Sequence, residues 1–254
     1  MRLRQIAFVT RELEPALDDL TSVLGLAVCH RDPGVGKWGL VNGVLPVGND
    51  FLEVVTPVED GTSAGRYIDR RHGDGGYMVI LQCADAVAER ERITGLGVRA
   101  VWQADRPAYR ATHFHPADTG GILLSVDSVE PGADYTDLRC SWEPAATGWE
   151  DYVRTEKIGA MTGAELQSDD PAGMAALWSR ILDLPVVDRD GAPAIELTNA
   201  TLRFVPAEDG RGRGLGAIDL RATDPAAVLA AAEARGLLRG DNLIEVCGTR
   251  VHLV

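Results

Sequence analysis

The amino-acid sequence predicts an α+β protein in which a βαβββ repeat recurs along the chain. Three observations lead to this prediction. Apolar, β-branched segments are separated by Gly, Pro and Asn-Asp turns, amphipathic helical segments stand between them, and the order of one strand, one helix and three strands recurs. With 254 residues, 45% of them hydrophobic, the chain is long enough for one or two domains.

The first repeat begins with a strand-like segment, LRQIAFVT (3–10). A helix is predicted over 13–26, because Leu13, Ala16, Leu20, Val23 and Leu24 have the spacing of one buried stripe and Gly25 is a plausible cap. Three strand-like segments follow, separated by turn residues. They are AVCHRD (27–32), KWGLVNGVLPVG (37–48) and DFLEVVTPV (50–58).

The same order recurs in a second repeat, with a strand at 75–85, a helix at 86–97 and strands at 98–105, 109–116 and 121–129. A third repeat is indicated because LWSRILDLPV (177–186) parallels LTSVLGLAV (20–28), and TLRFVPAED (201–209) parallels FLEVVTPVED (51–60). A fourth, shorter repeat covers 214–254. We therefore expect a first domain over 1–130, a linker over 131–155 that is rich in Pro, Gly and acidic residues, and a second domain over 156–254.

The composition excludes some classes of partner. Lys and Arg number 25 against 38 Asp and Glu, for a net charge of −13, and the basic residues are scattered. Binding to phosphate backbones needs clustered positive charge, so we expect no nucleic-acid partner. No apolar run approaches the roughly 20 residues that cross a bilayer, and the start lacks a signal peptide's apolar middle, so we expect a cytoplasmic protein with no membrane partner. The four separated cysteines are typical of small buried hydrophobic residues.

Three segments carry a resemblance to a known superfamily. They are RQIAFVTRELEPALDDL (4–20), FLEVV (51–55) and HPADTGGILLSV (115–126). Together they resemble the vicinal-oxygen-chelate superfamily, which includes glyoxalase I, extradiol dioxygenases, bleomycin-resistance proteins and methylmalonyl-CoA epimerase. The resemblance implies two tandem glyoxalase-like domains, each with a curved mixed sheet around a cavity and helices on the outer face. Because this fold hosts unrelated reactions, it implies a fold more than a function.

In that superfamily a metal ion is held by residues from the first and last strands of each repeat. The matching positions here are Gln5, Glu53, Ser125 and, on the strand at 75–85, Tyr77 or a neighbour such as Gly76 or Met78. Glu53 is a hard ligand and Gln5 an acceptable neutral one, whereas Tyr77 is a poor ligand at neutral pH and Ser125 stands where a carboxylate is expected. The resemblance therefore implies a degenerate site, either with one divalent ion (Ni, Mn, Fe or Zn) on Gln5, Glu53 and His113 or with no metal.

The stretch THFHPADTGG (112–121) carries two histidines whose role stays open. His113 and His115 are two residues apart, so on a strand they point to the same face. If they face the cavity, they lie on the strand next to Ser125 and either replace missing metal ligands or form a general acid/base pair. Alternatively, His115 precedes Pro116 at the strand end and caps the turn, while the residues after it build the bend.

The apolar setting of Glu53 leaves two roles open. Glu53 shares a strand face with Phe51 and Val55, where an unpaired carboxylate would be costly to bury. It is either a salt-bridge partner, for example of Arg110, or a cavity residue whose raised pKa suits it to proton abstraction next to a carbonyl. Arg203 stands at the matching position of the second domain, so that half is expected to support or cover the first.

We expect a small-molecule ligand in the cavity of residues 1–130 and a monomer or a homodimer. The first hypothesis is a lyase, an isomerase or a dioxygenase-like enzyme that acts on a small carbonyl or enolisable substrate. The second is a non-catalytic protein that sequesters an antibiotic-like compound, resembling bleomycin-resistance proteins, and the third is an interaction scaffold with filled cavities. The expected catalytic residues are Glu53, His113, His115 and Tyr77, and the expected ligand-binding residues are Gln5, Trp38, Trp102 and Ser125.

Overall fold

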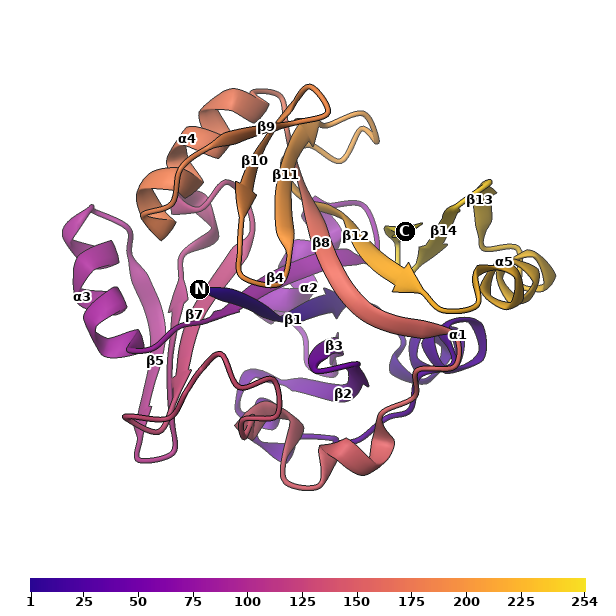
Figure 1. The fold of residues 1–254 in the computed structure, drawn as a ribbon, viewed down its shortest axis with the longest axis horizontal. Coiled ribbons are helices and arrows are strands. Elements are labelled where there is room, and N and C mark those ends of the chain that lie inside the picture. The colour runs from indigo at the N-terminus through magenta and orange to yellow at the C-terminus, as the bar shows by residue number, and fades with distance from the viewer. The chain divides into compact units, whose positions relative to one another are not determined.

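The computed structural model describes all residues 1–254, and its strands form two mixed sheets (Figure 1). The seven-stranded sheet has the order β2-β3-β1-β4-β7-β6-β5, and the eight-stranded sheet has the order β13-β14-β15-β12-β8-β11-β10-β9. Parallel and antiparallel pairs occur together, since β7 runs parallel to β4 and antiparallel to β6. The predicted α+β fold of tandem repeats is confirmed.

The elements have the following bounds. The strands of the seven-stranded sheet are β1 (Arg2–Val9), β2 (Leu40–Val47), β3 (Asp50–Pro57), β4 (Gly75–Gln82), β5 (Ala100–Arg106), β6 (Tyr109–Phe114) and β7 (Leu123–Val129). Those of the eight-stranded sheet are β8 (Ile158–Ser168), β9 (Val187–Arg189), β10 (Ala192–Glu196), β11 (Thr201–Pro206), β12 (Gly214–Ala222), β13 (Leu238–Gly240), β14 (Leu243–Val246) and β15 (Thr249–Leu253). The α-helices are α1 (Leu13–Leu24), α2 (Ser63–Arg70), α3 (Ala86–Gly95), α4 (Pro171–Leu182) and α5 (Pro225–Ala234), and the short 3-10 helices include η1 (Pro33–Trp38) and η2 (Pro116–Asp118).

The helix predicted after the first strand is present as α1. Its buried residues include all five of the predicted stripe, Leu13, Ala16, Leu20, Val23 and Leu24. Gly25 ends the helix in the left-handed conformation, with φ of 72°, and its N–H donates to the Thr21 carbonyl. Glycine adopts this conformation without the steric cost that a Cβ brings, which is why the helix ends there.

The first repeat departs from the prediction between its helix and β2. Residues 27–32 were predicted as a strand, but they contribute only an isolated bridge between His30 and Val44. Asp32 instead caps η1, accepting a hydrogen bond from the Gly34 N–H at 2.7 Å. Pro33 begins η1 and has no N–H to donate, so the chain turns away from the sheet edge there. The helix α2, which the sequence analysis missed, follows β3.

Contacts group the chain into two compact units that cut across the repeats. Unit 1 consists of Met1–Gln5, Met78–Glu143 and Gly163–Leu215, and unit 2 consists of Ile6–Tyr77, Pro144–Thr162 and Gly216–Val254. Unit 1 therefore holds most of the second and third repeats, and unit 2 most of the first and fourth. The domain limits expected from the sequence follow the repeats instead and stay a prediction.

In unit 1, α3 covers one face of β6 and β7 (Figure 1). Its buried residues are Ala86 and Ile93, and the Ala86 N–H donates to the Ser128 hydroxyl at 3.2 Å. Side chains that point to the same side as Ser128 are therefore covered by the helix. Residues with the opposite orientation, which include Asp127, lie on the other face of the sheet and need a different cover.

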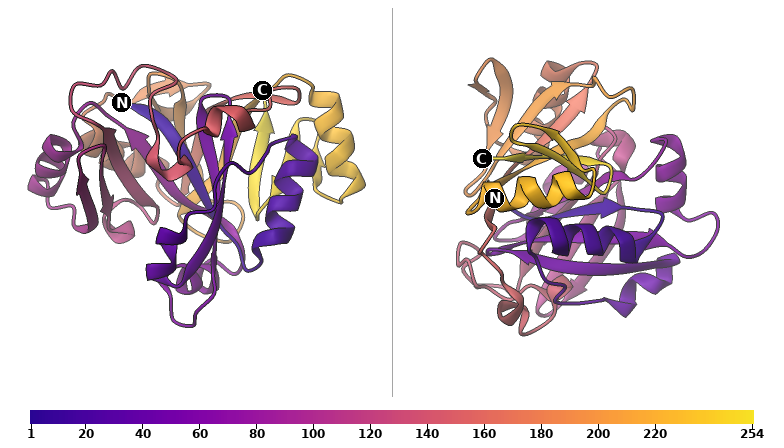
Figure 2. Two further views of the ribbon diagram at one scale, coloured as in Figure 1. Left: turned by 90° about the horizontal axis from the view of Figure 1, so that it is seen from below. Right: turned by 90° about the vertical axis from the view of Figure 1, so that its right-hand side faces the viewer.

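In unit 2, α1 and α5 lie side by side (Figure 2). Arg235, which follows α5, forms ion pairs with Asp18 and Asp19 of α1, and its Nε lies 2.8 Å from Asp19 Oδ1. These two carboxylates use one guanidinium group, which links the helices at their polar faces.

No helix of the chain is both long enough and apolar enough to span a membrane. All four cysteines are free thiols, with Cys83 and Cys247 buried and Cys29 and Cys140 half-buried.

Candidate active site

A row of paired side chains crosses the face of β5, β6, β7 and β4 that α3 leaves uncovered. Trp102 pairs with His113, His113 with Ser125, and Ser125 with Ile80. Paired residues on neighbouring strands point to the same face, so these four side chains form one row. The rings of Trp102 and His113 are in contact, with centroids 4.5 Å apart. The structure therefore brings together three residues that the sequence analysis selected.

The next row along the strands has a carboxyl group in it. It consists of Ala104, Ala111, Asp127 and Gln82. Alanine side chains end at Cβ, so the space above the first two residues has to be occupied by another part of the protein, and Ala111 is nevertheless buried. Asp127 is only 1% exposed, and Gln82, which ends the row on β4, is fully buried.

Two hydroxyl groups hold the Asp127 carboxyl. Tyr109 Oη donates to Oδ2 at 2.5 Å, and Ser125 Oγ donates to Oδ1 at 2.5 Å. Ser125 lies two residues earlier on β7 and therefore points to the same face, while Tyr109 comes from β6. Each carboxyl oxygen has its own donor, which fixes the orientation of the group.

Burial raises the pKa of Asp127 to about 7, and the hydrogen bonds from Ser125 and Tyr109 act in the opposite direction. Burial also raises the pKa of Tyr109 well above its usual range, and the neighbouring Asp127 charge adds to this rise. Tyr109 therefore keeps its proton and stays a donor. A carboxyl whose pKa is near 7 can release and accept a proton at physiological pH, as an acid/base group must.

The cover over this face comes from residues 134–143 of the linker, named the strap below. From residue 130 to residue 144 the only buried side chain is that of Trp142. Its indole N–H donates to Gln5 Oε1 at 2.7 Å, and its ring meets the Tyr109 ring edge-on, with centroids 5.6 Å apart. Gln5, predicted as a metal ligand, thus has its amide oxygen engaged by the indole.

A second strap residue lies on the Asp127 row. Gln82 Nε2 donates to Cys140 Sγ at 3.2 Å, and the Cys140 carbonyl accepts a hydrogen bond from Arg4 Nη2 at 3.0 Å. With Cys140 on Gln82 and Trp142 on Tyr109, the strap crosses directly over the part of the sheet that carries Asp127.

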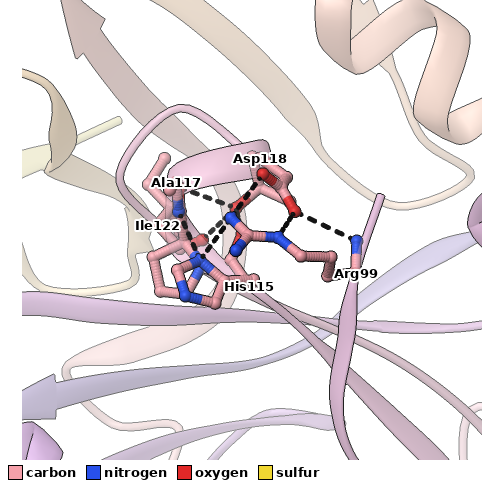
Figure 3. A network of polar contacts seen from close by, with 7 residues as sticks. Arg99, His115, Ala117, Asp118 and Ile122 are labelled. Carbon is pink, nitrogen blue, oxygen red and sulfur yellow. Dashed lines mark hydrogen bonds and ion pairs between the residues drawn. The ribbon is translucent and has the colours of Figure 1, made fainter. Parts of the chain in front are cut away.

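His115 caps the turn after β6, which is the second of the two roles considered from the sequence (Figure 3). It caps η2, since its Nδ1 accepts a hydrogen bond from the Ala117 N–H at 3.1 Å. Arg99 Nη2 lies 3.4 Å from the same nitrogen, and the Arg99 guanidinium also binds Asp118 through two hydrogen bonds of 2.7 and 2.8 Å. The guanidinium holds the pKa of Asp118 well below its usual range.

The bend after His115 is built by glycine, as the sequence suggests. Gly120 and Gly121 have φ of 78° and 93°, in the left-handed region, and the Gly121 N–H donates to the Pro116 carbonyl at 2.7 Å. A Cβ at Gly120 would lie 2.5 Å from the terminal methyl of Met174, which would have to move, and the left-handed backbone itself favours glycine at this position.

Glu53 lies in unit 2 and is buried, with 8% of its surface exposed. Asn42 Nδ2 donates to Glu53 Oε1 at 2.7 Å, and Asn42 Oδ1 accepts a hydrogen bond from the Asp32 N–H at 2.8 Å. The partner considered from the sequence, Arg110, instead donates to the Pro107 carbonyl. The buried Glu53 carboxylate therefore has a hydrogen-bond partner, as expected, and that partner is the Asn42 side-chain amide.

Tyr77 and Trp38, which were predicted as site residues, lie in unit 2 and contact nearby residues of that unit. Tyr77 packs edge-on against Tyr67 of α2, with ring centroids 5.0 Å apart, and burial raises its pKa to about 12. It lies on the opposite face of β4 from residues such as Ile80, because successive strand residues alternate. Trp38 is 38% exposed, with Lys37 Nζ 4.1 Å from its ring centroid.

The donor chemistry does not fit a metal centre. No group of three or more His, Cys, Asp or Glu side chains is placed to hold an ion. Of the three predicted ligands, Gln5 accepts from Trp142 and Glu53 accepts from Asn42, each at 2.7 Å, and His113 contacts Trp102. Divalent ions need at least two strong protein ligands at one place, and these residues do not supply them.

In the eight-stranded sheet, Arg203 has a carboxylate partner. Its Nη2 lies 2.9 Å from Glu165 Oε1, and the two residues are paired in the register of β11 and β8. Glu165 comes two residues after Gly163, the position of the third repeat that matches Gln5. The pairing neutralises Arg203 and leaves little positive charge there to attract an anion.

Asp127 is the functional candidate that the sequence analysis missed. The superfamily position matched on β7 is Ser125, which lacks the expected carboxylate. The sequence could have indicated Asp127, because side chains alternate along a strand and residue 127 therefore shares a face with residue 125. The carboxyl of Asp127 lies within the apolar run LLSVDSV, where burying it without a partner would be as costly as burying Glu53. The sequence alone could therefore also have indicated a hydrogen-bond partner for Asp127.

Comparison with known proteins finds solved structures with a similar fold at low sequence identity. No protein-family model and no curated protein matches the chain. Among solved structures, a variant of 4-hydroxymandelate synthase from Streptomyces coelicolor is similar with a TM-score of 0.68 at 17% identity, over 92% of this chain and 75% of that chain. A hypothetical protein from Staphylococcus aureus is similar with a TM-score of 0.66 at 12% identity, over 99% of this chain and 98% of that chain.

Methylmalonyl-CoA epimerase from Streptomyces coelicolor, at 20% identity and a TM-score of 0.46, spans 52% of this chain and 99% of its own. The two longer likenesses extend over both sheets at low identity, and they agree with the repeated βαβββ order and the two mixed sheets. These likenesses support the predicted fold of tandem glyoxalase-like βαβββ repeats for this chain.

Proposed function

We propose that the protein is an enzyme that enolises a small carbonyl compound on the Asp127 face, using acid/base chemistry by its own side chains. The observation that carries this proposal is the buried Asp127 carboxyl between the hydroxyls of Tyr109 and Ser125. The same face of the sheet carries His113, one of the residues expected from the sequence to act as an acid or base.

Asp127 is the base in this proposal. In its ionised form it takes a proton from the carbon next to the carbonyl group. The electrons of that C–H bond form the C=C bond of an enolate, and the negative charge moves to the carbonyl oxygen. Return of a proton to the same carbon, from either face, restores the carbonyl compound with an exchanged or inverted α-carbon, and no electron is gained or lost. With a pKa of about 7, about half of Asp127 is ionised at neutral pH.

His113 is the donor to the developing enolate oxygen. It is paired with Ser125 across β6 and β7, which places it on the same face as Asp127, and it is half-buried beside Trp102. An imidazole N–H stabilises negative charge on oxygen more effectively where water is excluded. Tyr109 and Ser125 orient the base, while Glu53 with Asn42 has a structural role in unit 2.

A second candidate function is binding without chemistry, as in the bleomycin-resistance proteins that the sequence resembles. Contact between the Trp102 and His113 rings, with centroids 4.5 Å apart, favours it because such a surface stacks against flat ligands. A binding protein would retain a ligand on this face and leave its C–H bonds unchanged.

Deuterium exchange distinguishes the two functions. The wild-type protein is incubated in D2O with a panel of 1,2-dicarbonyl compounds, 1,3-dicarbonyl compounds and aryl ketones, and loss of the proton next to the carbonyl is followed by NMR. The enzyme proposal expects accelerated exchange in at least one compound and a decrease of about 100-fold or more in Asp127→Asn. Asp105→Asn, at an exposed carboxylate paired with Arg90, is the control and keeps the wild-type rate.

The proposal is contradicted if no compound exchanges faster than in buffer, or if Asp127→Asn exchanges as fast as wild type. Binding of a panel compound without exchange would favour the sequestering function instead.

A further inference from the structure

We propose that Trp142 holds the place of an aromatic ligand, and that the strap moves aside when such a ligand binds. The inference rests on the proposed function and deepens it, because it assigns the substrate class: an aryl ketone whose ring takes the position of the indole. Three features of the molecule support it.

The first feature is the environment of the Trp142 ring. One end of the indole donates a hydrogen bond to Gln5 Oε1 at 2.7 Å. The ring is edge-on to Tyr109 at an interplanar angle of 89°, and the Arg4 guanidinium lies 5.3 Å from its centroid. A polar acceptor at one end, an aromatic wall and a cation over the face make a setting that suits any flat ring with a donor at its edge.

The second feature is the mainly polar attachment of the strap, whose backbone carbonyls at Asp137, Leu138 and Cys140 accept hydrogen bonds from Arg2 and Arg4 at 3.5, 3.4 and 3.0 Å. Trp142 is its only buried residue, and its other residues are exposed or half-buried. Glu143 forms an ion pair with Arg106 at 2.5 Å, but these side chains are 40% and 53% exposed, and exposed ion pairs contribute little stability. Segments with few buried apolar contacts open at low free-energy cost. An aromatic ligand that replaces the indole packs against the same Tyr109 ring and Arg4 guanidinium, which offsets that cost.

The third feature is the short path from the Trp142 position to the base. Tyr109 contacts the indole with its ring and hydrogen-bonds Asp127 with its hydroxyl. Next to Asp127 the paired residues are Ala111 and then Ala104, whose side chains end at Cβ, and a substituent reaches Asp127 across them only when the strap has moved aside, because Ala111 and Asp127 are both buried. A ring on Tyr109 that carries a ketone side chain can therefore direct its enolisable carbon toward the Asp127 carboxyl.

Alkylation of Cys140 measures the movement of the strap. N-ethylmaleimide is added to the full-length protein, and the modification of each cysteine is followed by peptide mass spectrometry. Cys29 is the internal reference, because it is also half-buried and its thiol contacts the Ala145 carbonyl in unit 2. The probe is 4-hydroxyphenylacetone, whose phenol hydroxyl can donate to Gln5 as the indole does. Cyclohexylacetone, which keeps the ketone side chain but has neither the aromatic ring nor the hydroxyl, is the control.

The expected result is that saturating 4-hydroxyphenylacetone increases the rate of Cys140 alkylation by about tenfold relative to Cys29, because the open state becomes the populated one. Cyclohexylacetone leaves the rate unchanged. Without any ligand, Trp142→Phe, which removes the donor to Gln5, increases Cys140 alkylation, whereas Trp149→Phe, at the other buried linker tryptophan, does not.

An unchanged Cys140 rate with the aryl ketone, or an equal increase with both ketones, overturns the inference. Asp127→Asn separates this failure from failure of the proposed function. In that variant the aryl ketone should still accelerate Cys140 alkylation while exchange is lost. If exchange persists in Asp127→Asn but the strap still responds, the assignment of the base is wrong and the aromatic site stands.

Discussion

The Tyr109 hydroxyl donates a hydrogen bond to Asp127 Oδ2 at 2.5 Å, and both side chains are buried. The pair links the strap to the base, since the Tyr109 ring also contacts the Trp142 ring. Changes at either residue should therefore affect both stability and chemistry.

Tyr109→Phe removes the donor and keeps the ring. We expect a decrease of about 1–3 kcal/mol in the free energy of unfolding, because a buried carboxyl loses a hydrogen bond. The pKa of Asp127 should rise further, because the hydrogen bond from Tyr109 favours the charged form. Urea unfolding measures the first effect, and Tyr152→Phe, at a tyrosine that is 42% exposed, is the control. Equal stability of Tyr109→Phe and wild type would contradict the pairing.

The stability of the protein should depend on pH through Asp127. This carboxyl has a pKa of about 7 in the folded chain and about 3.9 in an unfolded chain, so the folded state holds the proton more tightly. Its contribution is therefore complete below pH of about 4 and is lost as the pH rises through about 7. The difference in unfolding free energy between wild type and Asp127→Asn should decrease across that window. A difference that is constant with pH would disprove the raised pKa.

Asp118 should show the opposite dependence. Hydrogen bonds from the Arg99 side chain and backbone N–H hold its pKa well below the usual range, so its contribution is present above pH of about 3.9 and is lost as the pH falls. Carbon NMR of the carboxyl group should find the Asp118 midpoint below that of an ordinary aspartate, and Arg99→Ala should raise it toward the ordinary value without reaching it, because the backbone N–H of residue 99 still donates. An unshifted midpoint in the wild-type protein would rule out the ion pair in solution.

Substitution of His113 should affect the exchange rate, whereas substitution of His115 should affect stability. His115→Ala removes the cap of η2 and should lower the free energy of unfolding by about 0.5–2 kcal/mol, as at other capped turns, with little change in exchange rate. His113→Ala should lower the exchange rate by about 10-fold to 100-fold through loss of the donor to the enolate. Exchange assays and urea unfolding on the same two variants provide the measurement. Loss of activity in His115→Ala alone would reverse the assignment.

Much of the fold could be predicted because it depends on local patterns. The stripe of α1 and its Gly25 cap are fixed by spacing within one helix, and the repeated order of strands and helix is visible along the chain. The strand expected over 27–32 failed because Pro33 and the Asp32 cap turn the chain into η1. These local bonds prevail over the modest strand preference of the residues before them.

The candidate site was only partly predictable, because its decisive contacts join distant residues. That His113 and Ser125 lie on neighbouring strands was expected from the order of the strands, and the structure adds that the two residues are paired. The contact of Trp142 with Gln5 joins residues 137 positions apart, and the strap has no periodic pattern that would place it on a particular face. Asp127 was missed because the superfamily places its ligand two residues earlier, at the position of Ser125.

The role of Asp127 as the base is best tested by comparing Asp127→Asn with Glu53→Gln. Both variants neutralise a buried carboxylate, and both are assayed for α-deuterium exchange on the best compound of the panel after their folding is checked by circular dichroism. We predict that Asp127→Asn loses exchange by about 100-fold or more while Glu53→Gln stays within a few-fold of wild type. Full exchange in Asp127→Asn together with loss in Glu53→Gln would contradict this assignment and move the base to unit 2.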